Sequence, residues 1–431
     1  MRDNVVELYP DRPPLGQYIR VGTTGHVQLE TLLESGRLPI ERAVVDGAMV
    51  VAQASLIKAL RECGRELVLE TGVAELSSLG RYESVVRKSA WAVAGRPLTL
   101  ADFEGSGGDE RLFKIASCAV DNGFHTVLSP SHVLSNASDP AFGVDRRCCE
   151  RLREILDSIG GSGIAIDYEL LITNHVLRDD AQRAILIGGL CGLPFDNLWV
   201  RTSGFGAEAT PIGVRRYVAA LRDFIALGRP IVADGVAGLA GLAALAFGAA
   251  GALGHGVGVL ERFDAASWNR APKARKGGGQ AIRALVPALD RQLTLKQFNA
   301  VTAASGGRAL ISCNDRRCCK RGLDDTFNDP KGHYLWRRKT QLDALSRVPE
   351  ARRAEHFISQ DLAQAERYAR MLSRLKINDL ETQQLISRES DRLFKLHQVL
   401  ENFHMHENTG ERALTPPVRR SANSRFAQGS R

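Results

Sequence analysis

Short apolar runs alternate with amphipathic stretches through residues 1–265. The runs that predict strands are Tyr18–Val21, Ala43–Asp46, Leu67–Glu70, Thr126–Ser129, Gly163–Tyr168, Asn197–Arg201, Pro230–Asp234 and Ala252–Leu260. The stretches with helical periodicity are His26–Ser35, Val51–Cys63, Arg147–Ile159, Asp179–Gly189 and Gly213–Leu227. This alternation predicts parallel strands joined by right-handed helical crossovers. We therefore expect an α/β fold, a (β/α)8 TIM-like barrel, with a doubly wound sheet as the alternative.

One apolar run, Val236–Leu253, has the length of a candidate membrane span. It consists mostly of Ala and Gly, whose transfer into a bilayer gains little free energy, so we interpret it as a buried helix. The first residues, Met1-Arg-Asp-Asn-Val-Val-Glu, lack the apolar segment of a secretory leader. The sequence thus predicts a cytoplasmic protein without a membrane segment.

Four acidic residues stand at or near the ends of predicted strands, namely Asp46, Glu70, Asp167 and Asp234. Active sites of (β/α)8 barrels are built at the carboxyl ends of the strands. A single acid there often caps the following helix instead. Because four occur in equivalent places, we expect at least two of them to face one pocket.

Three of the eight cysteines are clustered in Cys313-Asn-Asp-Arg-Arg-Cys318-Cys319, and His356 follows at the head of an amphipathic stretch. Three thiolates and one imidazole form a ligand set that tetrahedral Zn²⁺ favours. A site closed by four protein ligands leaves no open position for water, so the zinc would be structural. The alternative is a loop of unpaired buried or reactive thiols.

The regular alternation of predicted strands and helices ends near residue 265. A basic, glycine-rich loop at Pro272–Gly279 can approach phosphates, and stretches His356–Leu375 and Asp379–Phe403 carry helical apolar stripes. The second stripe packs against the barrel or forms a dimer seam. The predicted division is a barrel at 1–265, a zinc-binding subdomain with a final barrel-associated helix at 266–375, a C-terminal helix at 376–408, and a disordered basic tail at 409–431.

The formal net charge is +8, with 57 Lys and Arg against 49 Asp and Glu. A basic balance favours polyanionic partners, although it describes electrostatic steering more than specificity. Nucleic acid is therefore the partner class that the composition favours.

A barrel followed by clustered cysteines and a distant His on a helix resembles the tRNA-guanine transglycosylases and their relatives that insert 7-deazaguanine bases into DNA. The family motif Cys-x-Cys-x-x-Cys is matched at its first and third cysteines by Cys313 and Cys318, with Asp315 at the middle position. Cys319 supplies the missing thiolate. The helix beginning at His356 resembles the family's ligand-bearing helix, so His356 is preferred as fourth ligand, and His333 remains open.

Upstream segments resemble the family in the same order. Glu70-Thr71-Gly72 resembles the segment holding the first active-site Asp, which falls on Glu70. Asp167 falls where the family reads the base with Gln. The segment ending in Ser203-Gly204-Phe-Gly206 resembles a family strand and loop. The resemblance implies that Asp46, Thr71, Gly72, Ser203 and Gly204 bind substrate.

The resemblance departs from the family at the catalytic nucleophile, because the expected Asp falls on Gly254, beside His255. Three repairs are open. Asp234 could act as nucleophile; Glu70 could do so, with Asp167 or His255 transferring protons; or catalysis is lost.

Three functions follow from these residues. The first is a base-exchange transglycosylase that replaces guanine with a 7-deazaguanine derivative in nucleic acid, with DNA favoured over tRNA, acting alone, as a homodimer or with partner proteins. The second is a non-catalytic nucleic-acid-binding or assembly subunit. The third is an unrelated barrel lyase or hydrolase with a fortuitous zinc site.

Overall fold

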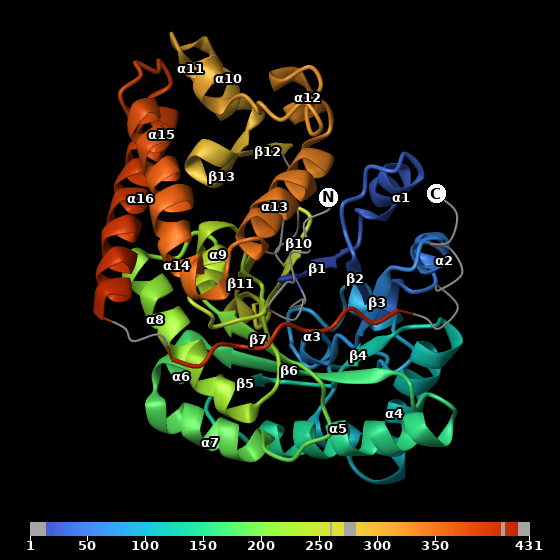
Figure 1. Cartoon of the computed structure of the whole chain (residues 1–431). Helices are drawn as coiled ribbons and strands as arrows, with labels where there is room; N and C mark the ends of the chain where they lie inside the picture. Colours follow the sequence, from blue (N-terminus) through green and yellow to red (C-terminus); the bar gives the residue numbers. More distant parts are fainter. Residues whose placement is uncertain (1–13, 259–260, 271–281, 407–409, 421–431) are drawn as a thin grey trace, which may run out of the picture.

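A closed barrel of parallel strands forms the body of the molecule (Figure 1). The computed structural model describes residues 14–258, 261–270, 282–406 and 410–420. Within them the barrel strands are β1 (Gly16–Arg20), β2 (Arg42–Asp46), β3 (Glu66–Glu70), β4 (Thr126–Leu128), β6 (Ala165–Thr173), β7 (Leu198–Ser203), β9 (Ile231–Asp234) and β10 (Ala252–Gly256). Each pairs in parallel with its neighbours, and the β1–β10 and β6–β7 pairings close the ring. The predicted barrel is confirmed, and the doubly wound alternative is wrong.

Helices lie on the outside of the barrel. They are α1 (His26–Glu34), α2 (Ala54–Glu62), α4 (Gly105–Asp121), α5 (Pro140–Ser158), α7 (Asp180–Leu190), α8 (Pro211–Arg222) and α9 (Gly238–Ala246). Among them, α5, α7 and α8 begin at capping side chains. The carboxylate of Asp139 accepts a hydrogen bond from the backbone of Ala141, and proline occupies the first turn of α5 and α8. Such caps satisfy backbone N–H groups that a helix start leaves unpaired.

Side chains fill the barrel interior in three layers, because alternate residues of each strand point inward. The middle layer is apolar and consists of Tyr18, Val44, Val68, Leu128, Trp199, Val232 and Ala252. The layers at the amino and carboxyl ends of the strands are charged. The middle layer therefore separates two sets of buried ionic groups.

Residues 410–420, which we call the C-terminal strap, run along the amino end of the barrel (Figure 1). The Arg419 guanidinium lies 3.2 Å from an Asp167 carboxylate oxygen and donates to Thr126 Oγ1 at 2.7 Å. Its backbone N–H donates to Glu66 at 3.0 Å, and Arg42 also pairs with Glu66 at 3.2 Å. This part of the predicted disordered tail is thus a packed segment, because its arginine neutralises buried acids; residues 421–431 lie outside the described residues.

A cysteine-containing segment is inserted between the last strand and the helix that completes the barrel. After β10 come the hairpin β12 (Arg283–Val286) and β13 (Arg291–Thr294), then α10 (Leu295–Ala303), α11 (Gly307–Ile311) and α12 (Leu323–Asn328). Helix α13 (Pro330–Ser346) returns to the barrel wall, where Tyr334 contacts His255 and Ser346 accepts a hydrogen bond from Leu15. The predicted loop Pro272–Gly279 lies outside the described residues.

Helices α14 (Arg353–His356), α15 (Ala363–Ser373) and α16 (Leu380–His406) follow. Helix α16 packs on α15 and on α8, and buries Ile386, Leu393, Leu396 and Leu400 (Figure 1). Helix α9, within the long apolar run, is buried on all sides, as expected. In the described part of the chain, none of the helices has the length and apolar character needed to cross a bilayer.

Candidate functional site

A cluster of charged side chains occupies the carboxyl end of the barrel, and we call Arg20, Glu70, Glu169, Arg201 and Asp234 the mouth cluster. Arg20, at the end of β1, binds both oxygens of Asp234, through Nε at 3.1 Å and Nη2 at 2.6 Å. Its guanidinium also donates to Glu169 at 3.2 Å and to Glu70. One buried guanidinium thus holds carboxylates from three strands.

Arg201, on β7 opposite Asp234 of β9, contacts the same carboxylates from a second direction. It lies 3.4 Å from Glu70, 3.6 Å from Glu169 and 3.6 Å from Asp234. The ring centroid of Phe263 lies 4.6 Å from the Arg201 guanidinium carbon, and Trp268 packs against Phe263. Aromatic side chains after β10 therefore cover one side of the mouth cluster.

Exposure and protonation differ among the mouth carboxyls. The Glu70 side chain is 17% exposed, whereas that of Asp234 is fully buried. Burial and the neighbouring Glu70 charge raise the pKa of Glu169 to about 7, against the pull of Arg20 and Arg201. Burial alone would raise the pKa of Asp234 as well, but Arg20 and Arg201 hold it below the usual value. The cluster thus places a carboxyl that titrates near neutrality beside one held as an anion.

Asp46 lies beside the mouth cluster at the end of β2. Its carboxylate accepts a hydrogen bond from the backbone of Ala48 at 2.8 Å. Burial, followed by the charge of Glu70, raises the pKa of Asp46 to about 7. Three of the four predicted strand-end acids, Asp46, Glu70 and Asp234, therefore meet at one end of the barrel.

Gly254, which stands where the resemblance places a nucleophilic Asp, is next to Asp234 on the neighbouring strand. A Cβ atom at Gly254 would lie 2.4 Å from Asp234 Oδ1 and 3.2 Å from the Trp199 ring. A side chain cannot be added at Gly254 unless Asp234 moves. The carboxylate of Asp234 thus occupies the space that a residue 254 side chain would need.

The other predicted substrate-binding residues surround the mouth in different ways. The Thr71 carbonyl accepts from Trp91 Nε1 at 2.8 Å, and Gly72 takes a left-handed conformation at φ 65°. Ser203 Oγ accepts from the backbone of Ala265 at 2.9 Å, and the Gly204 N–H donates to the Phe263 carbonyl at 2.8 Å. Ser203 and Gly204 thus hold the aromatic segment over the mouth.

Asp167 and His255, which were both expected among the catalytic residues, lie away from the mouth. Asp167 is in the layer at the amino end of the barrel, where Asn197, Trp199 and Arg419 bind it. The expectation failed because β6 continues to Thr173, so Asp167 is near the beginning of its strand and Glu169 is one layer higher. His255 points outward to α13, with its Nδ1 3.1 Å from Tyr334 Oη, and burial lowers its pKa.

Sequence reasoning missed Arg20, Glu169 and Arg201. Only acids were predicted to matter near the strand ends, although Arg20 and Arg201 stand in comparable positions on β1 and β7. The alternation of inward-facing residues contained a usable signal, because Glu169 shares the inward face of Asp167 and Arg201 shares that of Trp199.

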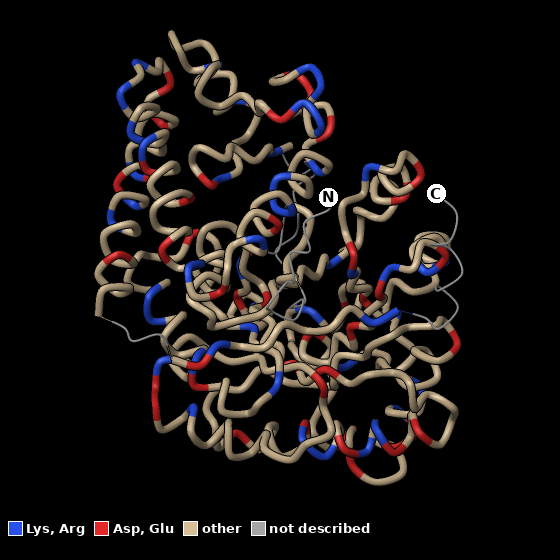
Figure 2. The backbone as a smooth tube through the Cα atoms, in the orientation of Figure 1, with Lys and Arg blue, Asp and Glu red and all other residues tan. Residues whose placement is uncertain are grey.

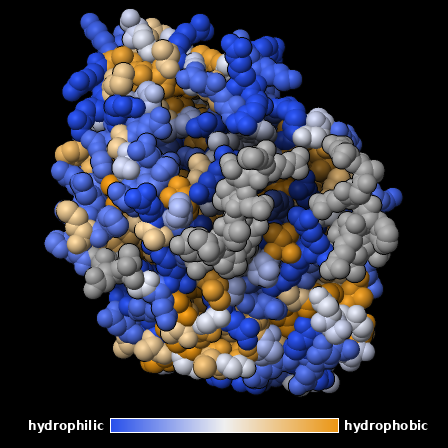
Figure 3. Space-filling model, viewed as in Figure 1, coloured by the Kyte–Doolittle hydropathy of each residue, from blue (hydrophilic) through white to orange (hydrophobic). Residues whose placement is uncertain are grey.

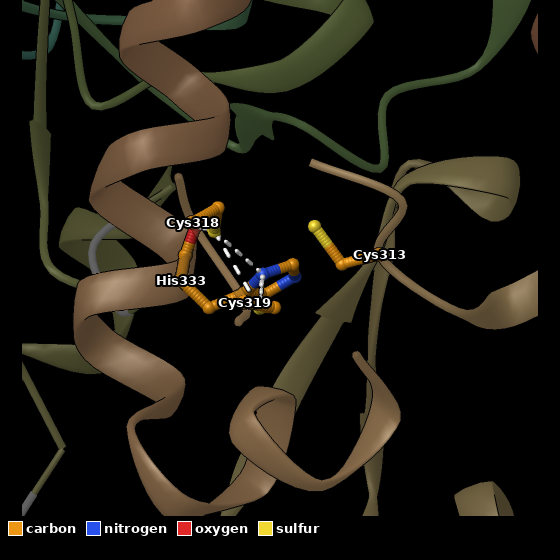
Figure 4. Close-up of side chains that lie close together, drawn as sticks. All are labelled: Cys313, Cys318, Cys319 and His333. Carbon is orange, nitrogen blue, oxygen red and sulfur yellow. Dashed lines mark hydrogen bonds between the residues drawn. The ribbon is translucent and has the colours of Figure 1, made fainter. Parts of the chain in front are cut away.

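A second candidate site is formed by Cys313, Cys318, Cys319 and His333, which we call the metal cluster. Its four buried ligand atoms lie within 4.8 Å of one another. The thiols of Cys318 and Cys319 are 3.6 Å apart, and each lies 3.3 Å from His333 Nδ1. Figure 4 shows Cys313 approaching the other three side chains from the opposite side. This arrangement fits a tetrahedral metal ion such as zinc.

A hydrogen bond behind the metal cluster fixes the orientation of the imidazole. His333 Nε2 lies 2.9 Å from the Leu285 carbonyl oxygen and donates its proton there. Nδ1 is then the atom without a proton, facing the thiols, as a metal-ligating histidine requires. The donor set and its support therefore both suit metal binding.

The preferred fourth ligand, His356, is wrong, and the open alternative His333 takes its place. His356 ends α14 and is only half-buried, whereas His333 is buried in the first turn of α13 directly beside the cysteines. Asp329 caps α13 through the backbone of Gly332, which places His333 at the cluster. The similarity of the helix at His356 to the family's helix therefore did not identify the fourth ligand, which depends on how α13 packs beside the cysteines.

Comparisons with known proteins add little beyond the fold. The sequence matches no protein-family model. A comparison with curated proteins finds no match. Similar solved structures include KGPDC from Streptococcus mutans (11% identity, 60% of this chain and 95% of that chain, TM-score 0.32), endo-1,4-beta-xylanase XylE from Penicillium canescens (10%, 55% and 80%, 0.36) and type I 3-dehydroquinate dehydratase from Clostridium difficile (8%, 60% and 92%, 0.34). These enzymes are diverse and distant, so they carry no argument about the activity of this chain.

Proposed function

We propose that this protein is a base-exchange transglycosylase that replaces guanine with a 7-deazaguanine derivative in nucleic acid, with DNA favoured over tRNA. A TIM barrel is a fold typical of enzymes, and the mouth cluster lies at the end where barrel enzymes place their chemistry. The observation that carries the proposal is the pairing of Glu70, the mouth carboxylate exposed to solvent, with Glu169, whose pKa is about 7.

In this proposal Glu70 is the nucleophile and Glu169 transfers the proton. The Glu70 carboxylate attacks C1′ of the sugar, the bond from C1′ to the base nitrogen breaks, and the leaving guanine takes the Glu169 proton. The incoming base then returns a proton to Glu169, attacks C1′ and releases Glu70. Both carboxyls bind the Arg20 guanidinium, which keeps them within reach of one sugar.

Asp234 supplies charge rather than a covalent bond. It is buried and held as an anion by Arg20 and Arg201. Together with Glu70 it provides negative charge beside the positive charge that develops at C1′ when the old base leaves. The Asp234 carboxylate fills the space beside Gly254. The mouth therefore has an acidic side chain there although β10 carries no Asp.

A structural zinc in the metal cluster fits the same function. The cluster links the inserted segment to α13, and hence to the barrel wall. The excess of basic residues, +8 over the chain, would attract the phosphate backbone of the substrate.

The proposal is tested by incorporation of labelled guanine into duplex DNA and into tRNA. We expect Glu70→Gln and Glu169→Gln each to reduce exchange at least about a hundredfold, because each removes a group that reacts. Glu154→Gln, an exposed carboxyl on α5, is the matched control and should exchange normally. Full turnover by Glu70→Gln would refute its role as nucleophile.

A second candidate function, a non-catalytic nucleic-acid-binding or assembly subunit, is favoured by the closure of the mouth. Glu169, Arg201 and Asp234 are at most 5% exposed, and their charges bind one another. Structural ion-pair networks share this arrangement. Binding of DNA with a steep salt dependence, without exchange of any purine or deazapurine base, would favour this function.

A further inference from the structure

A basic groove lies on the outside of the barrel, away from the mouth cluster. Its volume is about 310 Å³, which is within the range of small-molecule sites. Pro39, before β2, and Arg317, from the cysteine segment, form its walls. Trp336, Lys339 and Asp343 of α13 line it, together with Arg347 directly after the helix. We call it the α13 groove.

One face of α13 supplies most of this surface. Trp336, Lys339, Asp343 and Arg347 are spaced three or four residues apart, so they follow one stripe of the helix. The opposite stripe, with Tyr334 and Arg338, is buried against the barrel. The barrel therefore fixes the helix and leaves the groove face free to take a ligand.

The charges in the α13 groove sum to an excess of cations. Lys339 pairs with Asp343, and Arg317 lies 3.3 Å from Asp315. Arg347 is exposed and has no ion pair with any residue in the described ranges. Arg316 and Lys320 are also exposed on the same cysteine segment and add to its basic charge. Figure 2 shows Lys and Arg on this segment and along α13, and Figure 3 shows a mostly hydrophilic surface there.

An aromatic side chain is held firmly at one end of the groove. The indole N–H of Trp336 donates to Asp315 at 3.0 Å, and the ring packs against the buried cysteines of the metal cluster. The Arg317 guanidinium carbon lies 5.7 Å from the ring centroid. An indole that is fixed on one side and has a guanidinium beside it is suited to stack on a flat, electron-rich ring.

We propose that the α13 groove binds a single-stranded segment of the nucleic-acid substrate, outside the segment whose base is exchanged. Lys339 and Arg347 bind its phosphates, and an unpaired base stacks on Trp336 beside Arg317. The bases of a duplex are already stacked on each other, so this site selects an unpaired segment. The proposal rests on the proposed function, because it names where a second part of that substrate is held.

Binding of a fluorescently labelled single-stranded DNA of about 12 nucleotides tests the groove directly. We expect the double variant Lys339→Glu/Arg347→Glu to lose at least tenfold in affinity and to show a shallower salt dependence, because phosphate contacts release counterions. Trp336→Phe should weaken binding about fivefold. It should also remove most of the change in the protein's tryptophan fluorescence that DNA binding causes. The matched control is Arg215→Glu/Arg216→Glu, which makes the same charge change on exposed residues of α8.

Several results would overturn the proposal. These are unchanged affinity in the groove variant, an equal loss in the α8 control, or duplex DNA that binds as tightly and depends on the groove as strongly as the single strand. Competition by GMP or by polyglutamate as effective as that by the unlabelled oligonucleotide would also overturn it. Zinc content and melting temperature identify variants that have simply misfolded, and Arg347→Gln then provides a milder test.

The groove and the proposed function fail separately. Groove variants that bind like the unmodified protein, in a protein that exchanges guanine, would refute the groove alone. Groove-dependent binding in a protein that exchanges no base would refute the transglycosylase and leave the groove in place.

Discussion

Glu169 and Asp234 bind the same guanidinium, yet their environments shift their pKa values in opposite directions. Asp234 contacts Arg20 through both oxygens and also faces Arg201, so its charge is well compensated. Glu169 shares its cations with the nearby charge of Glu70 and therefore holds its proton to higher pH. Two buried carboxyls of the same chemistry are thereby given different protonation states at neutral pH.

This difference predicts how the stability of the protein depends on pH. The pKa of Glu169 is about 7 in the folded protein, against 4.5 for an ordinary glutamate. The contribution of protonated Glu169 to the free energy of unfolding is therefore complete below about pH 4.5. It is lost as the pH rises through about 7. Relative to the unmodified protein, Glu169→Gln should gain up to ~3 kcal/mol in free energy of unfolding between about pH 5 and pH 8. Urea denaturation at several pH values measures this, and equal pH profiles would contradict it.

At the residue scale, the sequence located only part of the mouth. Asp46, Glu70 and Asp234 were found because acids that end strands are visible in the apolar pattern. Asp167 was assigned to the wrong end of the barrel because the predicted strand ended at Tyr168, whereas β6 continues to Thr173. The layer in which an inward-facing side chain lies depends on where its strand begins and ends. Arg20 stands at a strand end as the acids do, but its role depends on the three carboxylates that the closed barrel brings to it.

At the scale of elements, the metal cluster shows what spacing predicts and what it does not. Three ligands close together in one segment, Cys313, Cys318 and Cys319, were identified from spacing alone. The fourth comes from a separate helix, and its identity depends on how α13 returns to the inserted segment. Local sequence cannot supply that information, so the choice between His333 and His356 required the structure.

The metal cluster gives a direct prediction for these two histidines. His333→Ala should lower bound zinc well below one ion per chain and reduce the melting temperature, because it removes a ligand from a buried site. His356→Ala should leave both unchanged. Elemental analysis of the purified protein, with thermal unfolding, measures these outcomes; equal zinc content in the two variants would contradict the assignment.

At the scale of the whole molecule, the alternation of strands and helices was sufficient to predict a barrel. Each strand–helix unit is local in sequence, and parallel strands with right-handed crossovers have few ways to pack. The return of α13 and the docking of the C-terminal strap were not predicted, because both join segments that are far apart in the chain. The composition of the strap predicted disorder, because the acids that bind its arginine lie in strands far away in the sequence.

The C-terminal strap predicts a strong effect from one arginine. Arg419→Ala should lower the free energy of unfolding by about 3 kcal/mol, because it leaves Asp167 and Glu66 buried with less compensating charge. Arg420→Ala, its exposed neighbour, is the matched control and should change stability little. Denaturation of both variants provides the measurement.

A double variant distinguishes charge compensation from a general loss of packing. If Arg419 acts through Asp167, then adding Asp167→Asn to Arg419→Ala should cost less than the sum of the two single changes. Strict additivity of the two changes would contradict the pairing.

The position of Arg419 in the chain has a consequence for synthesis on the ribosome. All the strands of the barrel leave the exit tunnel long before this arginine does. Until it emerges, Asp167 and Glu66 at the amino end of the growing barrel lack one of the cations that compensate their charge. During that interval the nascent barrel would be loosest at its base, where water or a chaperone can still reach it. Emergence of the C-terminal strap, rather than of the final strand, would then be the event that closes this end of the barrel.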